Sequence, residues 1–181
     1  MDKQSLVQLA LDLGASKAVI IPQEKIVLSA EFRKICEGNG CGRFKSNWMC
    51  SPTIGDIETL MAKVRSYKWG LWYQLIGDIE DSYDFEGMMQ AGQNHNRIAK
   101  SLRTVFEKAG ISNPLHLGAG GCRVCGVCAK RTGEPCRHPD LAMSSLEAYG
   151  INVSRLAPAA DMKYINGNNT VTYFGAVFFR F

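Results

Sequence analysis

The sequence has no apolar stretch of 18 residues, and residues 1–5 lack the basic and apolar regions of a secretory signal. We therefore expect a cytoplasmic protein without a membrane segment. Internal repeats, low-complexity tracts and linker-like runs are also missing, which favours a single metal-binding α/β domain over residues 1–181. Hydrophobic residues make up 46% of the 181-residue chain, which is enough for a buried core and excludes a disordered chain.

Several signatures of catalysis and ligand binding are also absent. The glycine-rich segment 118–121 lacks both the GxGxxG pattern and the Lys-Ser/Thr pair of a phosphate-binding loop. No carboxylate pair, activated serine or cofactor fingerprint stands beside the cysteines. The net charge is only +4, and no basic motif interleaved with aromatic residues is present. Nucleic acid is therefore disfavoured as a partner.

Cysteine, in contrast, is plentiful. The chain has seven cysteines, an odd number that cannot pair completely into disulfides. Seven is also too few for a small disulfide scaffold of this length. Because cytoplasmic thiols are kept reduced, the cysteines point to metal binding or catalysis.

The clearest motif is C-x₂-C-x₂-C at Cys122, Cys125 and Cys128, with Cys136 farther along in the same insert, residues 122–139. Bacterial [4Fe–4S] sites use the same triple and take a fourth ligand from elsewhere in the chain. We therefore predict a [4Fe–4S] cluster on these four thiols. A structural zinc ion is the alternative, although zinc sites more often have two C-x₂-C pairs separated by a longer loop. Free thiols are the third interpretation.

A second insert, residues 36–52, contains Cys36, Cys41 and Cys50. Three thiolates on a [4Fe–4S] cluster would leave one iron open to a small molecule, as a catalytic zinc keeps one open position. The unequal spacing also fits zinc, and it fits structural or reactive thiols. The seven cysteines then divide into four and three, which explains their odd number.

Basic residues surround both inserts. Around each group of cysteines lie four basic residues against one acidic residue: Arg33, Lys34, Arg43 and Lys45 against Glu37, and Arg123, Lys130, Arg131 and Arg137 against Glu134. Such neighbours would compensate an anionic cluster and favour ionised thiols. The alternative is a solvated basic loop or an RNA-binding patch.

Three single residues complete the set of candidates. His138 is a candidate to hydrogen-bond a cluster or replace a ligand, and Trp48 is a candidate to shield a metal site from water. His95 is predicted to be a core or pocket histidine.

The apolar periodicity predicts an α/β sandwich in which helices flank a mixed central sheet. Helices are expected at 3–13, 24–35, 57–64, 85–109, 140–149 and from residue 153, and strands at 18–21, 69–76, 114–117, 162–165 and 170–179. The last two strands should form a hairpin, and the final strand, apolar on both faces, should be central in the sheet. Thr53 and Asp56 are predicted to form a capping box.

The cysteine blocks resemble those of the domain-of-unknown-function 2284 family, described as predicted metal-binding proteins. The similarity lies in residues 36–52, 121–128, 135–139 and 144–153, and the match spans nearly the whole chain. Ser51 stands where the family usually has proline, and Phe44 where tyrosine is common, but neither difference removes a thiol. The resemblance implies metal binding without an established reaction.

These features together predict a redox-active iron–sulfur protein. The four-cysteine cluster would pass electrons to the three-cysteine cluster, whose open iron would bind a small-molecule ligand. Such a protein would be a small reductase or a sulfur-handling oxidoreductase, supplied by a redox partner protein. The alternative is a non-enzymatic module that binds zinc or a single cluster and docks a partner enzyme through its basic loops.

Overall fold

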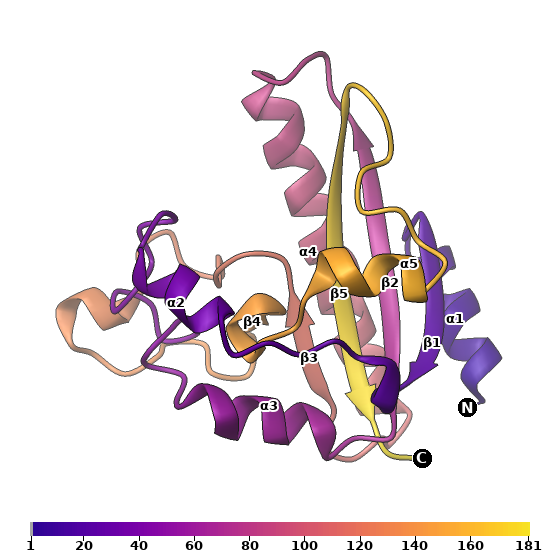
Figure 1. Cartoon of the computed structure of the whole chain (residues 1–181), viewed down its shortest axis with the longest axis horizontal. Coiled ribbons are helices and arrows are strands. Elements are labelled where there is room, and N and C mark those ends of the chain that lie inside the picture. The colour runs from indigo at the N-terminus through magenta and orange to yellow at the C-terminus, as the bar shows by residue number, and fades with distance from the viewer. Residues whose placement is uncertain (1) are drawn as a thin grey trace.

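The computed structural model describes residues 2–181 and has a mixed α/β fold around a five-stranded sheet of order β1-β2-β5-β3-β4 (Figure 1). The strands are β1 (Lys17–Pro22), β2 (Trp69–Asp78), β3 (Leu115–Gly118), β4 (Ser144–Ser145) and β5 (Thr170–Phe179). The α-helices are α1 (Lys3–Asp12), α2 (Phe32–Glu37), α3 (Ile57–Arg65), α4 (Phe85–Lys108) and α5 (Val153–Ala159). Three short 3₁₀ helices are η1 (Gln23–Lys25), η2 (Ala129–Thr132) and η3 (Glu147–Tyr149). The predicted α/β class with a mixed sheet is confirmed.

Strand β5 occupies the centre of the sheet, as its apolar residues on both faces predicted. It pairs antiparallel with β2 on one side and with β3 on the other. Strands β2 and β3 therefore run in the same direction, and α4 is the crossover between them. Strand β4 pairs parallel with β3, and the segment that joins these two strands carries the second cysteine insert.

Two hydrophobic cores cover the two faces of the sheet. Successive side chains of a strand point to opposite faces, so Leu71 and Tyr73 pack against α1 and α4, while Trp72 packs against α3 and α5. All three side chains are almost fully buried. The sheet is therefore a layer between helices, as the sandwich prediction requires.

Side-chain caps fix the starts of the helices that border the site. The Asp84 carboxylate accepts a hydrogen bond from the Gly87 backbone N–H at the start of α4 (2.8 Å). At the start of α3 the Asp56 carboxylate accepts one from the Thr59 N–H (3.0 Å). The predicted cap at Thr53 is therefore wrong, because Asp56 is itself the N-cap residue.

The predicted helix at 24–35 is wrong, because only η1 and the short α2 form there. The backbone between them pairs with a distant segment: the Ser29 N–H donates to the Gly150 carbonyl, and the Asn152 N–H donates to the Val27 carbonyl. The predicted helix at 140–149 is also replaced, by β4 and η3. There the Leu146 N–H donates to the Gly118 carbonyl (3.0 Å), which extends the edge of the sheet.

The predicted strand at 162–165, and with it the terminal hairpin, is also wrong. These residues form no strand, and β5 pairs with β2 over its whole length instead. The segment packs through side chains, with the Tyr164 ring stacked on Phe174 at 6.0 Å. The Asn166 amide donates to the Thr172 hydroxyl (2.9 Å), which holds the turn against β5.

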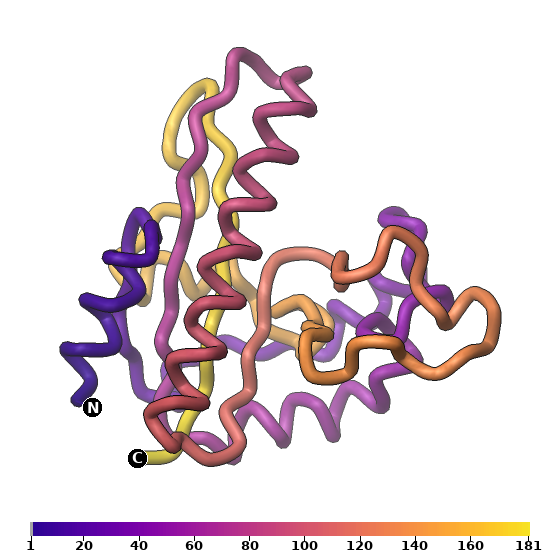
Figure 2. The backbone as a smooth tube through the Cα atoms, turned by 180° about the vertical axis from the view of Figure 1, so that it is seen from behind, coloured from indigo at the N-terminus to yellow at the C-terminus, as the bar shows by residue number. Residues whose placement is uncertain are grey.

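The two cysteine inserts project together from the β4 edge of the sheet. Figure 2 shows them side by side, apart from the long β2–β5 pair and from α4. The first insert leads from α2 to α3, and the second from β3 to β4. None of the helices between residues 2 and 181 is long and apolar enough to cross a membrane.

Candidate metal centre

The two inserts are tied together by side chains of the first insert that bond to the backbone of the second. The Arg43 Nη1 and Asn47 Nδ2 groups both donate to the carbonyl oxygen of Cys122, at 3.1 and 3.2 Å. The Trp48 Nε1 donates to the carbonyl oxygen of Glu134 (2.9 Å). These bonds fix the backbone at both ends of the second cysteine motif and hold the two inserts together.

Gly121, which directly precedes the second insert, packs closely against the first insert. A Cβ atom at this position would lie 2.5 Å from Cδ of Arg43 and 3.1 Å from Sγ of Cys50. A side chain here would force the Arg43 side chain to shift, so the contact favours glycine. The contact also places the Cys50 thiol beside the residue that precedes Cys122.

All seven cysteines have free thiols; Cys41 is exposed and the others are partly buried. The four thiols of the second motif line one narrow cavity, together with Trp48 and His138. The lining thiols are Cys122, Cys125, Cys128 and Cys136. A second cavity of about 270 Å³ opens between the inserts and is lined by Cys41 together with Cys125 and Cys128. The structure therefore brings together thiols from both motifs.

Cys50 sits at the centre of a second group of thiols. Its pKa is raised to about 11, first because the side chain is buried, and further by negative charge on Cys41, Cys36 and Cys122. Arg43 lowers this pKa but does not outweigh burial. Arg43 therefore acts in the expected direction and favours the thiolate, while burial favours the neutral thiol. Cys122 belongs to the surroundings of both motifs.

The donor chemistry of these residues fits a metal. Thiolates are the ligands that iron–sulfur clusters, zinc and copper(I) prefer, and seven free cysteines stand on two touching loops. Within residues 2–181, however, no three His, Cys, Asp or Glu side chains lie close enough together to hold a metal ion as they stand. Binding would have to draw the thiols inward, which couples metal binding to the ordering of the loops.

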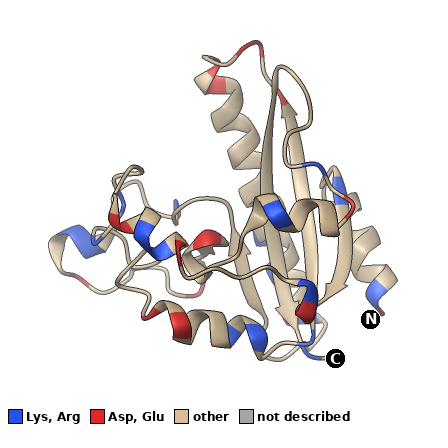
Figure 3. Cartoon of the chain, in the orientation of Figure 1, with Lys and Arg blue, Asp and Glu red and all other residues tan. Residues whose placement is uncertain are grey.

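The surroundings of the thiols are cationic. Figure 3 shows Lys and Arg segments on the inserts, including η2, which carries Lys130 and Arg131. In the described part of the chain the only ion pair joins Arg137 and Glu134 (2.8 Å). The other basic side chains near the thiols are therefore available to balance an anionic group. The Lys130 ammonium also lies 4.3 Å from the centre of the Trp48 ring, a cation–π contact between the inserts.

The three histidines differ in their relation to this centre. His138 lines the cavity of the second motif. His95 is a core residue, as predicted, stacked on Tyr73 at 5.4 Å. His116 is also buried, and its Nε2 lies 2.9 Å from the Tyr73 hydroxyl oxygen. Burial lowers the pKa of His95 to about 4 and that of His116 to about 3, so both rings are neutral.

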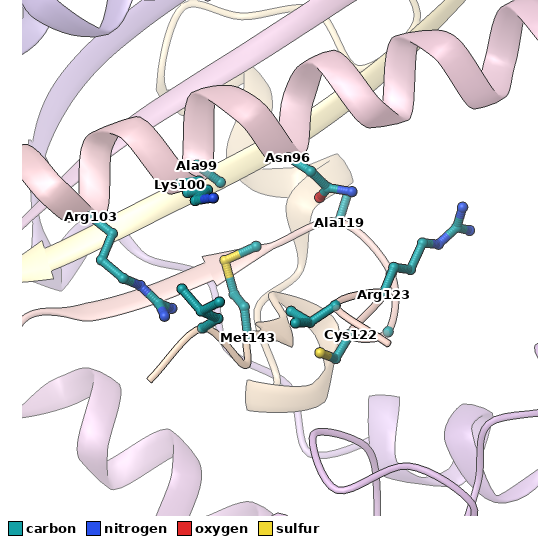
Figure 4. A pocket seen from close by; sticks show the side chains of 12 residues that line it. Asn96, Ala99, Lys100, Arg103, Ala119, Cys122, Arg123 and Met143 are labelled. Carbon is teal, nitrogen blue, oxygen red and sulfur yellow. The ribbon is translucent and has the colours of Figure 1, made fainter. Parts of the chain in front are cut away.

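A further cavity adjoins the thiols and was missed by the sequence reasoning. It has a volume of about 240 Å³ and lies between α4 and the loop that begins the second motif (Figure 4). Asn96, Lys100 and Arg103 of α4 line it, as does Cys122. The spacing of these α4 residues, four and then three, puts them on one side of the helix. This row of polar residues on one side of α4 is the feature of the sequence that could have indicated the cavity.

Comparison with known proteins supports metal binding. A family model described as a predicted metal-binding protein (DUF2284) matches residues 19–179, which include both cysteine inserts. Neither the curated proteins nor the solved structures give a significant match to the chain.

Proposed function

The chain belongs to the DUF2284 family of predicted metal-binding proteins, and from this premise we propose that the metal is iron, held as iron–sulfur clusters on the two inserts. Cys122, Cys125, Cys128 and Cys136 would hold a [4Fe–4S] cluster. The observation that carries the proposal is that these four thiols, spaced as in bacterial [4Fe–4S] sites, line one cavity. Cys36, Cys41 and Cys50 would hold a second cluster.

Bound clusters would supply one-electron transfer, and a cluster with three protein ligands has one iron open to a small molecule. The chain's own residues have supporting roles in this proposal. Arg43 and Asn47 hold the backbone of Cys122 in place. Trp48 covers the cavity of the second motif and limits access of water to it. The contact between the inserts supports a redox function in which two centres work together, as in a small reductase or a sulfur-handling enzyme.

The charge around the thiols supports an interaction with a redox partner protein. The basic side chains of both inserts that lack a carboxylate partner would balance the negative charge of thiolate-bound clusters. Those at the surface would also attract an acidic protein surface. A partner that delivers electrons is therefore proposed to dock on the projecting end of the molecule that Figure 3 shows.

Cysteine substitutions with metal analysis test the proposal. Cys41→Ser should remove only the iron of the three-cysteine site, and Cys128→Ser only that of the four-cysteine site, so that each variant keeps part of its iron and acid-labile sulfide. Ser66→Ala, a substitution at the end of α3, serves as a control for the handling of the protein. Loss of all iron from both cysteine variants would contradict two separate sites.

A second candidate is a module that binds zinc or a single cluster and docks a partner enzyme. It is favoured by the position of Cys122 among the neighbours of Cys50, because Cys36, Cys41, Cys50 and Cys122 would make a four-thiolate set of the kind that holds structural zinc. In that case the purified protein would be colourless and contain stoichiometric zinc.

A further inference from the structure

The cavity beside α4 has the composition of a small-molecule site. Its volume is about 240 Å³, and apolar side chains that include Ala99, Leu141 and Met143 form much of its wall. Pockets for small molecules are typically concave and mostly apolar, with a few polar groups that orient the ligand. Figure 4 shows the side chains of α4 on one side of this cavity and the loop with Cys122 and Arg123 on the other.

Three cationic residues and no acidic residue line this cavity. Lys100 and Arg103 come from α4, and Arg123 comes from the cysteine loop. None of them is paired with a carboxylate, since the only ion pair among residues 2–181 lies elsewhere, between Arg137 and Glu134. Three positively charged residues therefore line an apolar cavity, and no acidic residue in its wall compensates their charge.

The Arg103 side chain is held in place before any ligand arrives. Its Nη1 and Nη2 groups donate to the carbonyl oxygens of Asp140 and Ala142, which leaves its positive charge without an anionic partner. A cation that is already immobilised loses little conformational entropy when it binds an anion. Lys100 is exposed and can turn toward a ligand.

We propose that this cavity binds a small organic anion, with its carboxylate or phosphate group on Lys100, Arg103 and Arg123 and its apolar part against Leu141 and Met143. This binding site is distinct from the thiol cavities and does not depend on which metal they hold. Cys122 lines the cavity too, so the ligand would lie beside the metal centre. The site would therefore select anionic molecules for whatever chemistry that centre performs.

Calorimetric titration of the anaerobically purified protein with benzoate and with phenyl phosphate tests the proposal. Uncharged benzamide and benzyl alcohol are the matched controls. We expect the anions to bind with dissociation constants of about 1 mM or lower, as is usual for ligands of this size. Their affinity should fall as ionic strength rises. The anion that binds more tightly identifies the preferred head group. Equal affinity for the uncharged controls would overturn the proposal.

Lys100→Gln should weaken binding of the preferred anion by roughly fivefold, because it removes one charge-assisted contact. Arg123→Gln should do the same from the opposite wall. Lys108→Gln, on the same helix but outside the cavity, should bind like the wild type. If neither cavity variant changes the affinity, the site is elsewhere and the proposal fails. Metal analysis of the same samples reports separately on the proposed function. A protein that binds benzoate but contains no metal would contradict the proposed function and leave the anion site supported.

Discussion

The indole Nε1 of Trp48 donates a hydrogen bond of 2.9 Å to the carbonyl oxygen of Glu134, a residue 86 positions away. This bond joins the first cysteine insert to the second near Cys136. Trp48 is also part of the wall of the cavity of the second motif. A single aromatic side chain therefore couples the position of one loop to the shape of the other.

Trp48→Phe keeps most of the apolar surface and removes the donor. We expect the metal to be lost to a chelator about fivefold more readily, because a hydrogen bond of this kind contributes about 1 kcal/mol. The rate and extent of metal transfer to an excess of chelator measure this. Trp69→Phe, a change on β2, is the control and should leave metal retention unchanged. Equal retention in wild type and Trp48→Phe would show that the bond does not hold the loops together.

Cys122→Ser should have a larger effect than substitution of the other ligands of the same motif. Its thiol lines the cavity of the second motif and also lies near Cys50 of the first. We therefore expect Cys122→Ser to lower the metal content of both sites, and Cys136→Ser to lower that of one. Metal per chain and the visible absorption spectrum measure the difference. Identical losses in the two variants would contradict a shared position for Cys122.

Tyr73→Phe should destabilise the fold without touching the metal. The Tyr73 hydroxyl is the partner of His116 Nε2, and His116 Nδ1 has no hydrogen-bond partner among the described residues. The substitution would leave a buried ring with neither nitrogen paired, at a cost of about 1–3 kcal/mol in the free energy of unfolding. Urea unfolding measures it, with Tyr83→Phe as the control because Tyr83 is 78% exposed. An unchanged midpoint for Tyr73→Phe would contradict this role of the hydroxyl.

The two buried histidines predict lower stability in mild acid. Burial lowers the pKa values of His95 and His116 to about 4 and about 3, whereas in the unfolded chain they are near 6.5. Between pH 7 and pH 5 the unfolded state therefore binds more protons than the folded state, and the free energy of unfolding falls as the pH falls. The expected loss is on the order of 2 kcal/mol for each ring.

The variant His116→Gln isolates one of these contributions. Urea unfolding of wild type and variant at several pH values between 7 and 5 gives the two slopes. Metal ligation by the cysteines titrates alike in both proteins, so the difference in slope reports on His116. We expect a shallower slope for the variant, and parallel slopes would contradict the assignment.

Those parts of the fold that depend on one segment's own pattern could be predicted from the sequence. Apolar residues spaced three and four positions apart up to Gly110 predict the helix α4. Apolar residues on both faces of β5 predict that it is the central strand. The segment 162–165 has a similar local pattern but forms no strand, and it contacts β5 through the Tyr164 ring instead. Strand pairing depends on partner strands that are distant in the sequence, and the pattern of one segment carries no information about those partners.

The candidate metal centre likewise has features that one segment predicts and features that depend on distant segments. The spacing of Cys122, Cys125 and Cys128 indicates a metal motif from the sequence alone. The bonds from Arg43 and Asn47 to the Cys122 carbonyl were not predictable, because they join side chains to backbone across 79 and 75 residues. The cavity beside α4 was missed for the same reason, since its walls come from separate elements.

Metal analysis of the anaerobically purified chain, with iron, zinc and acid-labile sulfide measured on one sample, tests the central claim most directly. We expect a brown protein that absorbs near roughly 400 nm and contains about eight irons per chain for two [4Fe–4S] clusters, or about four if only the four-cysteine site is filled. A colourless protein with stoichiometric zinc and no sulfide would contradict it.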